Sequence, residues 1–309
     1  MKPMNILNGM MAFLLLLMQG CVMDDLSECG VSIHYQYTKN TDCVDKFLTE
    51  VKKVSLFVFD AQGLFLNEYT AETEQLNGGN LMYLNIPPGT YTLVAWGNLG
   101  DDYELPAFEK GKTKLKDARL SLKRSDNKCS RPPGSLFFGA LPQIKILPAL
   151  QKKQILTIDM MKDTKQIRVI TKGLSAQEIA QQKYNCSIAS ANGDYRFDNT
   201  IASSERLYYI PQSSVNAQGD WISDFVVMRE LNDGSTQSKL SVNIHNPEGK
   251  AGKELFRVDL PPLLLARSKS KNLDIEDAFE IEITLDFTNG SASVHIKGWS
   301  TIETGNPIG

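Results

Sequence analysis

Residues that commonly carry acid–base or metal chemistry are scarce in this chain of 309 residues. The three histidines, His34, His245 and His295, each occupy the polar position of a segment that alternates apolar and polar residues. Such positions face solvent when the segment forms a strand, which is typical of a sheet surface rather than of a catalytic centre. The GxSxG, HExxH, P-loop and GxGxxG motifs are all missing from the sequence. We therefore expect no catalytic residue, no metal site and no cofactor.

Cys21 is the residue with the most specific chemical setting. It directly follows Gly20, and an apolar run of about nine residues (10–18, MMAFLLLLM) precedes the pair. That run is too short to span a bilayer, which needs about 20 residues, and it has the length of a secretory signal, with Lys2 as its positive end. The sequence therefore predicts a signal peptide over 1–20.

A small residue directly before a cysteine at this place resembles a bacterial lipobox. In a lipobox the thiol receives a diacylglycerol thioether, and the new N-terminus is acylated after cleavage. Met18 and Gln19 differ from the usual leucine and small residue. We expect lipidation at Cys21, with an ordinary cleaved signal and an incidental cysteine as the alternative. Several acyl chains would make the attachment effectively permanent.

The segment 21–30 is expected to be a lipidated acidic tether. Asp24, Asp25 and Glu28 follow the cysteine closely, and this arrangement resembles the surface-export signal of Bacteroidota lipoproteins. A flexible linker that happens to be acidic is the alternative. With Asp24 and Asp25 as the export signal, the protein is expected on the outer membrane and facing outward.

The charge balance excludes one class of partner. The whole chain has 33 basic and 36 acidic residues and a net charge of −3, and loss of Lys2 with the signal leaves 289 residues with 32 basic and 36 acidic ones. Nucleic-acid binding needs a clear basic surplus. We therefore expect no nucleic-acid partner.

Four further cysteines are candidates for disulfides: Cys29, Cys43, Cys129 and Cys186. An even number in an exported chain permits disulfides, and four cysteines allow three pairings. Cys29 with Cys43 would close a short loop near the tether. The spacings do not match a zinc site, and the sequence leaves the pairing open.

The body of the chain has the pattern of β-strands. The segment 54–59 (VSLFVF) is nearly continuously apolar, as expected for a strand buried on both faces, and a turn at 60–63 leads into its hairpin partner. Asn289-Gly290 predicts a hairpin between 281–287 and 292–296. Ser175 to Glu178 form a capping box that begins a short helix. Further strands are expected at 31–38, 81–86, 90–96, 117–122, 136–139, 154–160, 166–171, 240–244 and 255–260.

Many short strands with turn signals about every ten residues indicate β-sandwiches. The length fits two of them, so we predict an all-β protein with domains at 31–162 and 163–309. The boundary is expected in the polar stretch from Lys162 to Lys165.

Of the three tryptophans, Trp96 ends an apolar strand and is expected in the core. Trp221 follows Gly219-Asp220 in an expected loop, and is the best candidate for an exposed, sugar-stacking ring.

Several stretches together resemble the Bacteroidales fimbrial anchor lipoproteins, the FimB-type group of the fimbrillin-like superfamily. The resemblance spans nearly the whole mature chain in order. The stretches that carry it are the tether 24–30 (DDLSECG), 54–60 (VSLFVFD) with Gly63, 86–91 (IPPGTY), 95–98 (AWGN), 136–139 (LFFG) and 281–299.

This resemblance implies two transthyretin-like β-sandwich domains and no enzymatic activity. It implies a base subunit that attaches a fimbrial polymer to the outer membrane through lipid on Cys21, and limits the polymer's length. The implied partners are fimbrial shaft subunits, which in that family join by strand donation, a form of β-augmentation. The resemblance implies no small-molecule substrate. The tail 300–309 is short and polar, and so a poor donor strand.

Two alternatives remain from the sequence. One is a surface lipoprotein that binds glycans for a nutrient-uptake system, which would display two or three aromatic residues in loops on one face. The other is an accessory or tip subunit of the same fimbrium. A surface hydrolase would need an acidic pair brought together by the fold.

Overall fold

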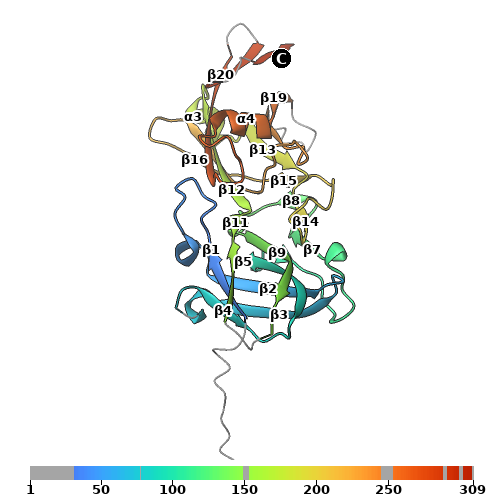
Figure 1. Ribbon diagram of the computed structural model, residues 1–309. Coiled ribbons are helices and arrows are strands. Elements are labelled where there is room, and N and C mark those ends of the chain that lie inside the picture. The colour runs from blue at the N-terminus through green and yellow to red at the C-terminus, as the bar shows by residue number, and fades with distance from the viewer. Residues whose placement is uncertain are drawn as a thin grey trace, which may run out of the picture.

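The computed structural model describes residues 31–76, 78–148, 153–244, 253–287, 291–298 and 302–307. Figure 1 shows two β-rich halves stacked along one long axis, with β1 to β5 and β9 in one half and α3, α4 and β12 to β20 in the other. The all-β fold class predicted from the sequence is confirmed by this arrangement.

Two sheets build the first half. The smaller sheet has the order β10-β1-β4, with β1 paired parallel to β10 and antiparallel to β4. The larger sheet has the order β11-β9-β5-β2-β3. The bounds are β1 Val31–Gln36, β2 Lys53–Asp60, β3 Phe65–Glu72, β4 Leu81–Leu84, β5 Gly89–Gly97, β9 Phe137–Ile146, β10 Gln154–Asp159 and β11 Met161–Lys162.

The larger sheet is a middle layer, buried on both faces. Along β2, Val54, Leu56 and Val58 pack in the core shared with β1, whereas Phe57 and Phe59 pack in a core that continues into the second half. This explains the nearly continuous apolar run, which was predicted as a doubly buried strand. The predicted hairpin with β3 is confirmed, and its turn places Gly63 at φ +75°.

The second half is also built from two sheets. One has the order β16-β17-β12-β20-β21-β22 and the other β19-β18-β13-β15-β8. The predicted closing hairpin is confirmed, since Leu285 pairs with Val294; its turn lies outside the described residues. The bounds are β12 Thr164–Lys172, β13 Tyr184–Ser190, β15 Leu207–Tyr209, β16 Gln212–Val215, β17 Trp221–Met228, β18 Lys239–Ile244, β19 Glu254–Asp259, β20 Ala278–Asp286, β21 Ser291–Ile296 and β22 Ile302–Pro307.

Short strands of the first half pair with strands of the second. β7 (Arg119–Leu122) lies between β6 (Tyr103–Glu104) and β14 (Asp194–Arg196), and β8 (Lys128–Cys129) pairs with β15. These ladders cross the predicted boundary at 162/163, and one apolar core runs through it. The two-domain division itself stays a prediction.

The helices are short. α3 (Ala176–Ala180) begins at the predicted capping box, in which Ser175 and Glu178 bond reciprocally. α4 (Leu260–Arg267) was not predicted, because Pro261 and Pro262 suggested only the end of a strand. Proline is favourable in the first turn of a helix, where the missing N–H has no partner to lose, and both prolines occupy that turn. The other helices are α2 (Phe47–Glu50), η1 (Thr73–Gln75) and η2 (Leu115–Asp117).

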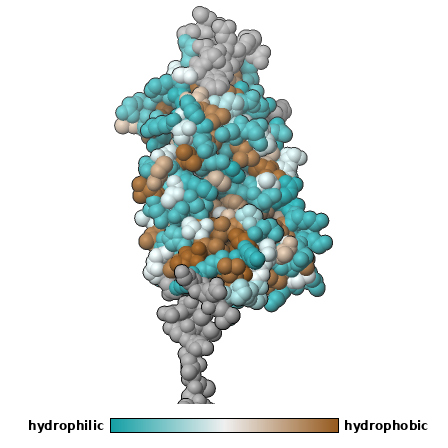
Figure 2. Space-filling model, in the orientation of Figure 1, coloured by the Kyte–Doolittle hydropathy of each residue, from teal (hydrophilic) through white to brown (hydrophobic). Residues whose placement is uncertain are grey.

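No helix within the described ranges has the length and apolarity needed to cross a membrane. On the face shown in Figure 2, hydrophilic residues dominate and the apolar residues form separate groups.

Candidate functional site: the junction of the halves and the open edge at β16

Four of the residues singled out from the sequence, Cys21, Asp24, Asp25 and Cys29, lie outside the described residues. Of the other candidate cysteines, Cys43 is an exposed free thiol, and Cys129 and Cys186 are buried free thiols. Burial raises the pKa of the Cys129 thiol, and raises that of Cys186 to about 12. Since the thiolate is the reactive form, the two buried cysteines have the character of core residues.

The histidines and tryptophans give no catalytic cluster. His34 is half-buried and His295 exposed, while His245 lies outside the described residues. Within the described part of the chain, no group of three or more histidine, cysteine or acidic side chains is placed to hold a metal ion.

Trp96 is fully buried, as predicted, whereas the prediction for Trp221 is wrong. Its indole is 8% exposed, because the turn ends at Asp220 and Trp221 is already the first residue of β17. Trp299 lies outside the described residues.

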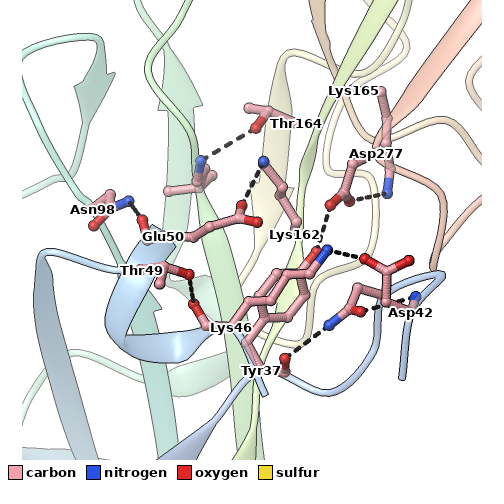
Figure 3. A network of polar contacts seen from close by, with 12 residues as sticks. Tyr37, Asp42, Lys46, Thr49, Glu50, Asn98, Lys162, Thr164, Lys165 and Asp277 are labelled. Carbon is pink, nitrogen blue, oxygen red and sulfur yellow. Dashed lines mark hydrogen bonds and ion pairs between the residues drawn. The ribbon is translucent and has the colours of Figure 1, made fainter. Parts of the chain in front are cut away.

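A polar junction joins the two halves (Figure 3). The buried hydroxyl of Tyr37, just after β1, donates to Asp277 Oδ2 at 2.7 Å. Lys165 Nζ, from β12, lies 4.0 Å from Asp277 Oδ1, and donates to the carbonyl oxygen of Asp274 at 3.0 Å. The Lys165 side chain is 0% exposed. Burial lowers its pKa to about 8, although the nearby carboxylates of Asp277, Asp163 and Asp274 oppose that shift.

Asp163 extends this junction into the second half. It is fully buried, and its Oδ1 accepts from Asn199 Nδ2 at 3.1 Å. Burial raises its pKa to about 6, although the charge of Arg229 and the hydrogen bond from Asn199 act to lower that pKa. Arg229 itself holds Asp274 through two bonds of 2.7 and 2.9 Å.

Lys162 closes the junction on the side of the first half. Its Nζ donates to Glu50 Oε2 at 2.8 Å (Figure 3). The ammonium also lies 5.7 Å from the centre of the Phe137 ring. The stretch from Lys162 to Lys165, in which the domain boundary was expected, is buried at every position. Buried charges are tolerated only when paired and hydrogen-bonded, so these residues hold the halves in one arrangement.

A second buried carboxyl lies beside the β13–β18 ladder. Glu230 accepts from Asn192 Nδ2 at 3.1 Å, Thr236 Oγ1 at 2.9 Å and Ser238 Oγ at 2.6 Å. It is fully buried, and burial raises its pKa to about 7, although the hydroxyl donors oppose that shift.

β16 is one of the two edge strands of the six-stranded sheet in the second half, and all four of its residues are exposed. A groove of about 510 Å³ lies next to it, lined by residues that include Ile179 of α3, Cys186 of β13 and Trp221 of β17. Ile210 and Val215 line the same groove and are 39% and 52% exposed. The sandwich thus presents an apolar opening directly beside an edge strand.

The register of the β16–β17 hairpin shows which backbone groups face outward. Asn216 N donates to Asp220 O at 3.1 Å, and the pairs continue as Val215 with Trp221 and Ser213 with Ser223. Hydrogen-bonded and non-bonded pairs alternate in an antiparallel ladder. The N–H and C=O groups of Ser213 and Val215 therefore point away from β17, along the free edge.

The fold is an all-β arrangement of several joined sheets, with one exposed edge strand of the kind that pairs with extended segments in β-augmentation. Comparison with known protein families gives a more specific assignment. The chain belongs to the family of fimbrillin-A associated anchor proteins Mfa1 and Mfa2, whose family model matches residues 26–305. The family resemblance recognised in the sequence is thereby confirmed.

Individual relatives agree with this family. The minor fimbrium anchoring subunit Mfa2 of Porphyromonas gingivalis is 25% identical over 293 residues, which cover 90% of this chain and 87% of that protein. The solved structure of the fimbrial anchor protein Mfa2 from the same organism has a TM-score of 0.72 at 24% identity, covering 89% of this chain and 99% of that one.

Two further solved structures share the fold. A Bacteroides ovatus protein described as an adhesin has a TM-score of 0.78 at 21% identity, covering 92% of this chain and 98% of that one. A Bacteroides thetaiotaomicron protein described as polysaccharide-binding has a TM-score of 0.73 at 24% identity, covering 89% and 98%. At these identities the likeness establishes the fold alone.

No local pattern indicated the junction partners, because Tyr37 and Asp277 are 240 residues apart. The edge strand β16 was also missed. Its sequence Gln-Ser-Ser-Val is too polar and too short for the alternation test, although Val215 and the Gly219 turn were visible signs of a hairpin.

Proposed function

We propose that this protein is the anchor subunit of a cell-surface fimbrium, held in the outer membrane by acyl chains on Cys21. The observation that carries the proposal is the family match over residues 26–305. The match begins within the acidic tether, five residues after Cys21. Asp24 and Asp25 then act as the signal for export to the cell surface. A structural role of this kind requires no enzymatic activity.

The partners in this proposal are fimbrial shaft subunits, and the joint is the free edge of β16. An extended segment of a shaft subunit pairs with the outward backbone groups of Ser213 and Val215, and its apolar side chains enter the adjoining groove. Main-chain bonds supply affinity in such β-augmentation, and alternate side chains in pockets supply specificity. The anchor thereby ends the polymer at the membrane and limits its length.

The proposed domains are 31–162 and 163–309, with the first half carrying the tether and the second half carrying the joint. The crossing strands β7 and β8 and the buried junction at Lys162 to Lys165 connect the two. Attachment to membrane and to polymer would thus lie in different halves of one tightly joined body.

The glycan-binding alternative lacks a supporting cluster of aromatic residues. Among the described residues, the large aromatic side chains that are exposed are Tyr83 of β4 and Tyr208 of β15, which belong to different sheets. An accessory or tip role differs from the anchor role only in where the protein lies along the polymer, which the following experiment addresses.

The test is the distribution of fimbrial polymer between cells and medium. We compare wild type, a deletion strain and Cys21→Ala, with Cys43→Ala as the control for loss of an exposed thiol. Long fibres in the medium for the deletion and Cys21→Ala, and cell-bound fibres for Cys43→Ala, support the anchor role. Cell-bound fibres in the deletion strain would refute it.

A further inference from the structure

The segment from Lys110 to Arg131 is strongly basic in an otherwise acidic protein. Its 22 residues include nine lysines and arginines against two acidic residues, Asp117 and Asp126, whereas the whole chain carries a net charge of −3. We call the exposed side of this segment the basic surface. A concentration of one sign of charge on one element creates a local potential that attracts ligands of the opposite sign.

The fold turns the lysines of this segment toward solvent. Gly111 N donates to Phe65 O at 2.7 Å, and Phe65 N donates to Thr113 O at 2.8 Å, so the segment lies along the beginning of β3. Leu115 packs against the core, and alternate positions in an extended segment face opposite sides. Lys112 and Lys114 therefore project outward; both are exposed, as is Lys116 in the following 3₁₀ turn.

Much of this charge is uncompensated. Three basic residues of the segment form ion pairs with acidic side chains: Lys112 with Glu109, Arg124 with Asp194 and Glu205, and Arg131 with Asp102. Five exposed lysines, in contrast, take part in no ion pair between residues that the structure describes: Lys110, Lys114, Lys116, Lys123 and Lys128. Lys123 and Lys128 also line a shallow cleft with Arg131 at the far end of the segment.

Charge is also divided between the halves. Residues 31–162 hold 17 basic and 14 acidic residues, and residues 163–309 hold 15 basic and 19 acidic ones. The half that the tether enters is therefore net positive, and the half with the β16 edge is net negative. A tether of ten residues spans at most about 35 Å when fully extended, which keeps the positive half close to its point of attachment.

We propose that the basic surface binds the phosphate-bearing headgroups of the outer leaflet, so that the body lies against the membrane rather than swinging on its tether. This inference rests on the proposed lipid anchor at Cys21. Lipid attachment and a polybasic surface are complementary signals for a membrane surface. Exposed lysines near anionic headgroups each strengthen binding severalfold, and salt screens the effect. The tether supplies the high local concentration that makes weak contacts effective.

The test measures the basic surface without the acyl chains. The full mature chain (21–309) carrying Cys21→Ser is sedimented with phosphatidylcholine vesicles that either contain or lack phosphatidylglycerol. We expect binding at low salt only to the anionic vesicles, and its loss at high salt. The triple variant Lys112→Gln, Lys114→Gln, Lys116→Gln should weaken this binding by about tenfold or more.

The matched control removes three lysines from the other half: Lys172→Gln, Lys269→Gln, Lys271→Gln. We expect it to bind within about twofold of the parent chain, because those positions do not contribute to the basic surface. Equal unfolding midpoints of the two triple variants show that folding is not the cause. Equal loss in both triples, or no binding by the parent chain at low salt, overturns the proposal. Because no acyl chain is present, either outcome leaves the anchor test at Cys21 unaffected.

Discussion

The hydroxyl of Tyr37 donates to Asp277 at 2.7 Å and so joins the end of β1 to the start of β20, across 240 residues of chain. Burial and the Asp277 carboxylate both raise the pKa of the phenol far above its ordinary value. The phenol therefore keeps its proton through neutral pH, and the bond persists. Lys165 lies beside the same carboxylate, so Asp277 receives a hydrogen bond from Tyr37 of the first half and an ionic contact from Lys165 of the second.

Loss of this hydrogen bond should destabilise the whole protein. Tyr37→Phe keeps the ring in its packed position and leaves a charged acceptor short of a donor. We expect the free energy of unfolding to fall by about 1–3 kcal/mol, measured by urea denaturation. Tyr69→Phe is the control, since that hydroxyl bonds to Asn85 O at an exposed site, and should change the free energy by less than about 0.5 kcal/mol. Equal losses in the two variants would contradict the assigned role of Tyr37.

The buried carboxyl of Glu230 should make stability fall as pH rises through the range from about 5 to about 7. Its pKa is raised from 4.5 to about 7, so in this range the folded state holds a proton that the unfolded state has lost. Unfolding then releases protons, and the free energy of unfolding decreases with pH. The full effect is on the order of 3 kcal/mol, and Asp163, with its pKa raised to about 6, adds in the same direction.

Glu230→Gln separates this contribution from the others. The amide keeps an acceptor for the surrounding hydroxyls and does not titrate. Urea unfolding at several pH values should give a flatter dependence for the variant than for wild type. Parallel curves for the two proteins would show that Glu230 is not the group responsible.

The free edge of β16 can be blocked without disturbing its own hairpin. Ser213→Pro removes an outward N–H, and proline is accepted in edge strands at such positions. We expect binding of a shaft subunit to weaken by about tenfold or more, since a backbone hydrogen bond is lost and the edge is sterically hindered. Ser213→Ala changes the same side chain but keeps the N–H, and should bind like wild type in a pull-down or titration. If both variants bind equally well, the joint lies elsewhere.

Two glycines with the same backbone angle should respond differently to alanine. Gly173 and Gly219 both have φ +85°, but a Cβ at Gly173 would overlap the carbonyl oxygen of Leu285, whereas a Cβ at Gly219 meets open space. Gly219→Ala should cost about 1–2 kcal/mol of stability from the angle alone. Gly173→Ala should cost roughly 2 kcal/mol more, because β12 and β20 must move apart. Thermal unfolding of both variants checks this order, and a reversed order would contradict it.

Local pattern was enough to predict most strands of this fold. The doubly buried β2, its hairpin with β3 and the capping box of α3 each depend on residues close together in sequence. The α4 helix was missed because Pro261-Pro262 ends a strand and begins a helix equally well, and only the packing of Leu260, Leu263 and Leu264 decides between them.

The junction could not be predicted for a different reason. The polar stretch from Lys162 to Lys165 indicated only a domain boundary, whereas long-range partners satisfy its side chains and allow burial: Glu50 for Lys162, Asn199 for Asp163 and Asp274 for Lys165. No local property of a charged stretch distinguishes a linker from a buried network. The same limit applies to β8, whose two residues join a sheet of the other half.

The position of β1 has a mechanical consequence. It is the central strand of its sheet, with a parallel ladder to β10 over Val31 to Gln36 and an antiparallel ladder to β4. If the proposed lipid anchor holds the N-terminus, tension enters at Val31 and acts along the strand, across the direction of its hydrogen bonds. Both ladders are thus loaded in shear, and their bonds must rupture together instead of opening one after another. A strand held in this way resists extraction better than an edge strand peeled from its end, which would suit the proposed anchor when the attached polymer is pulled.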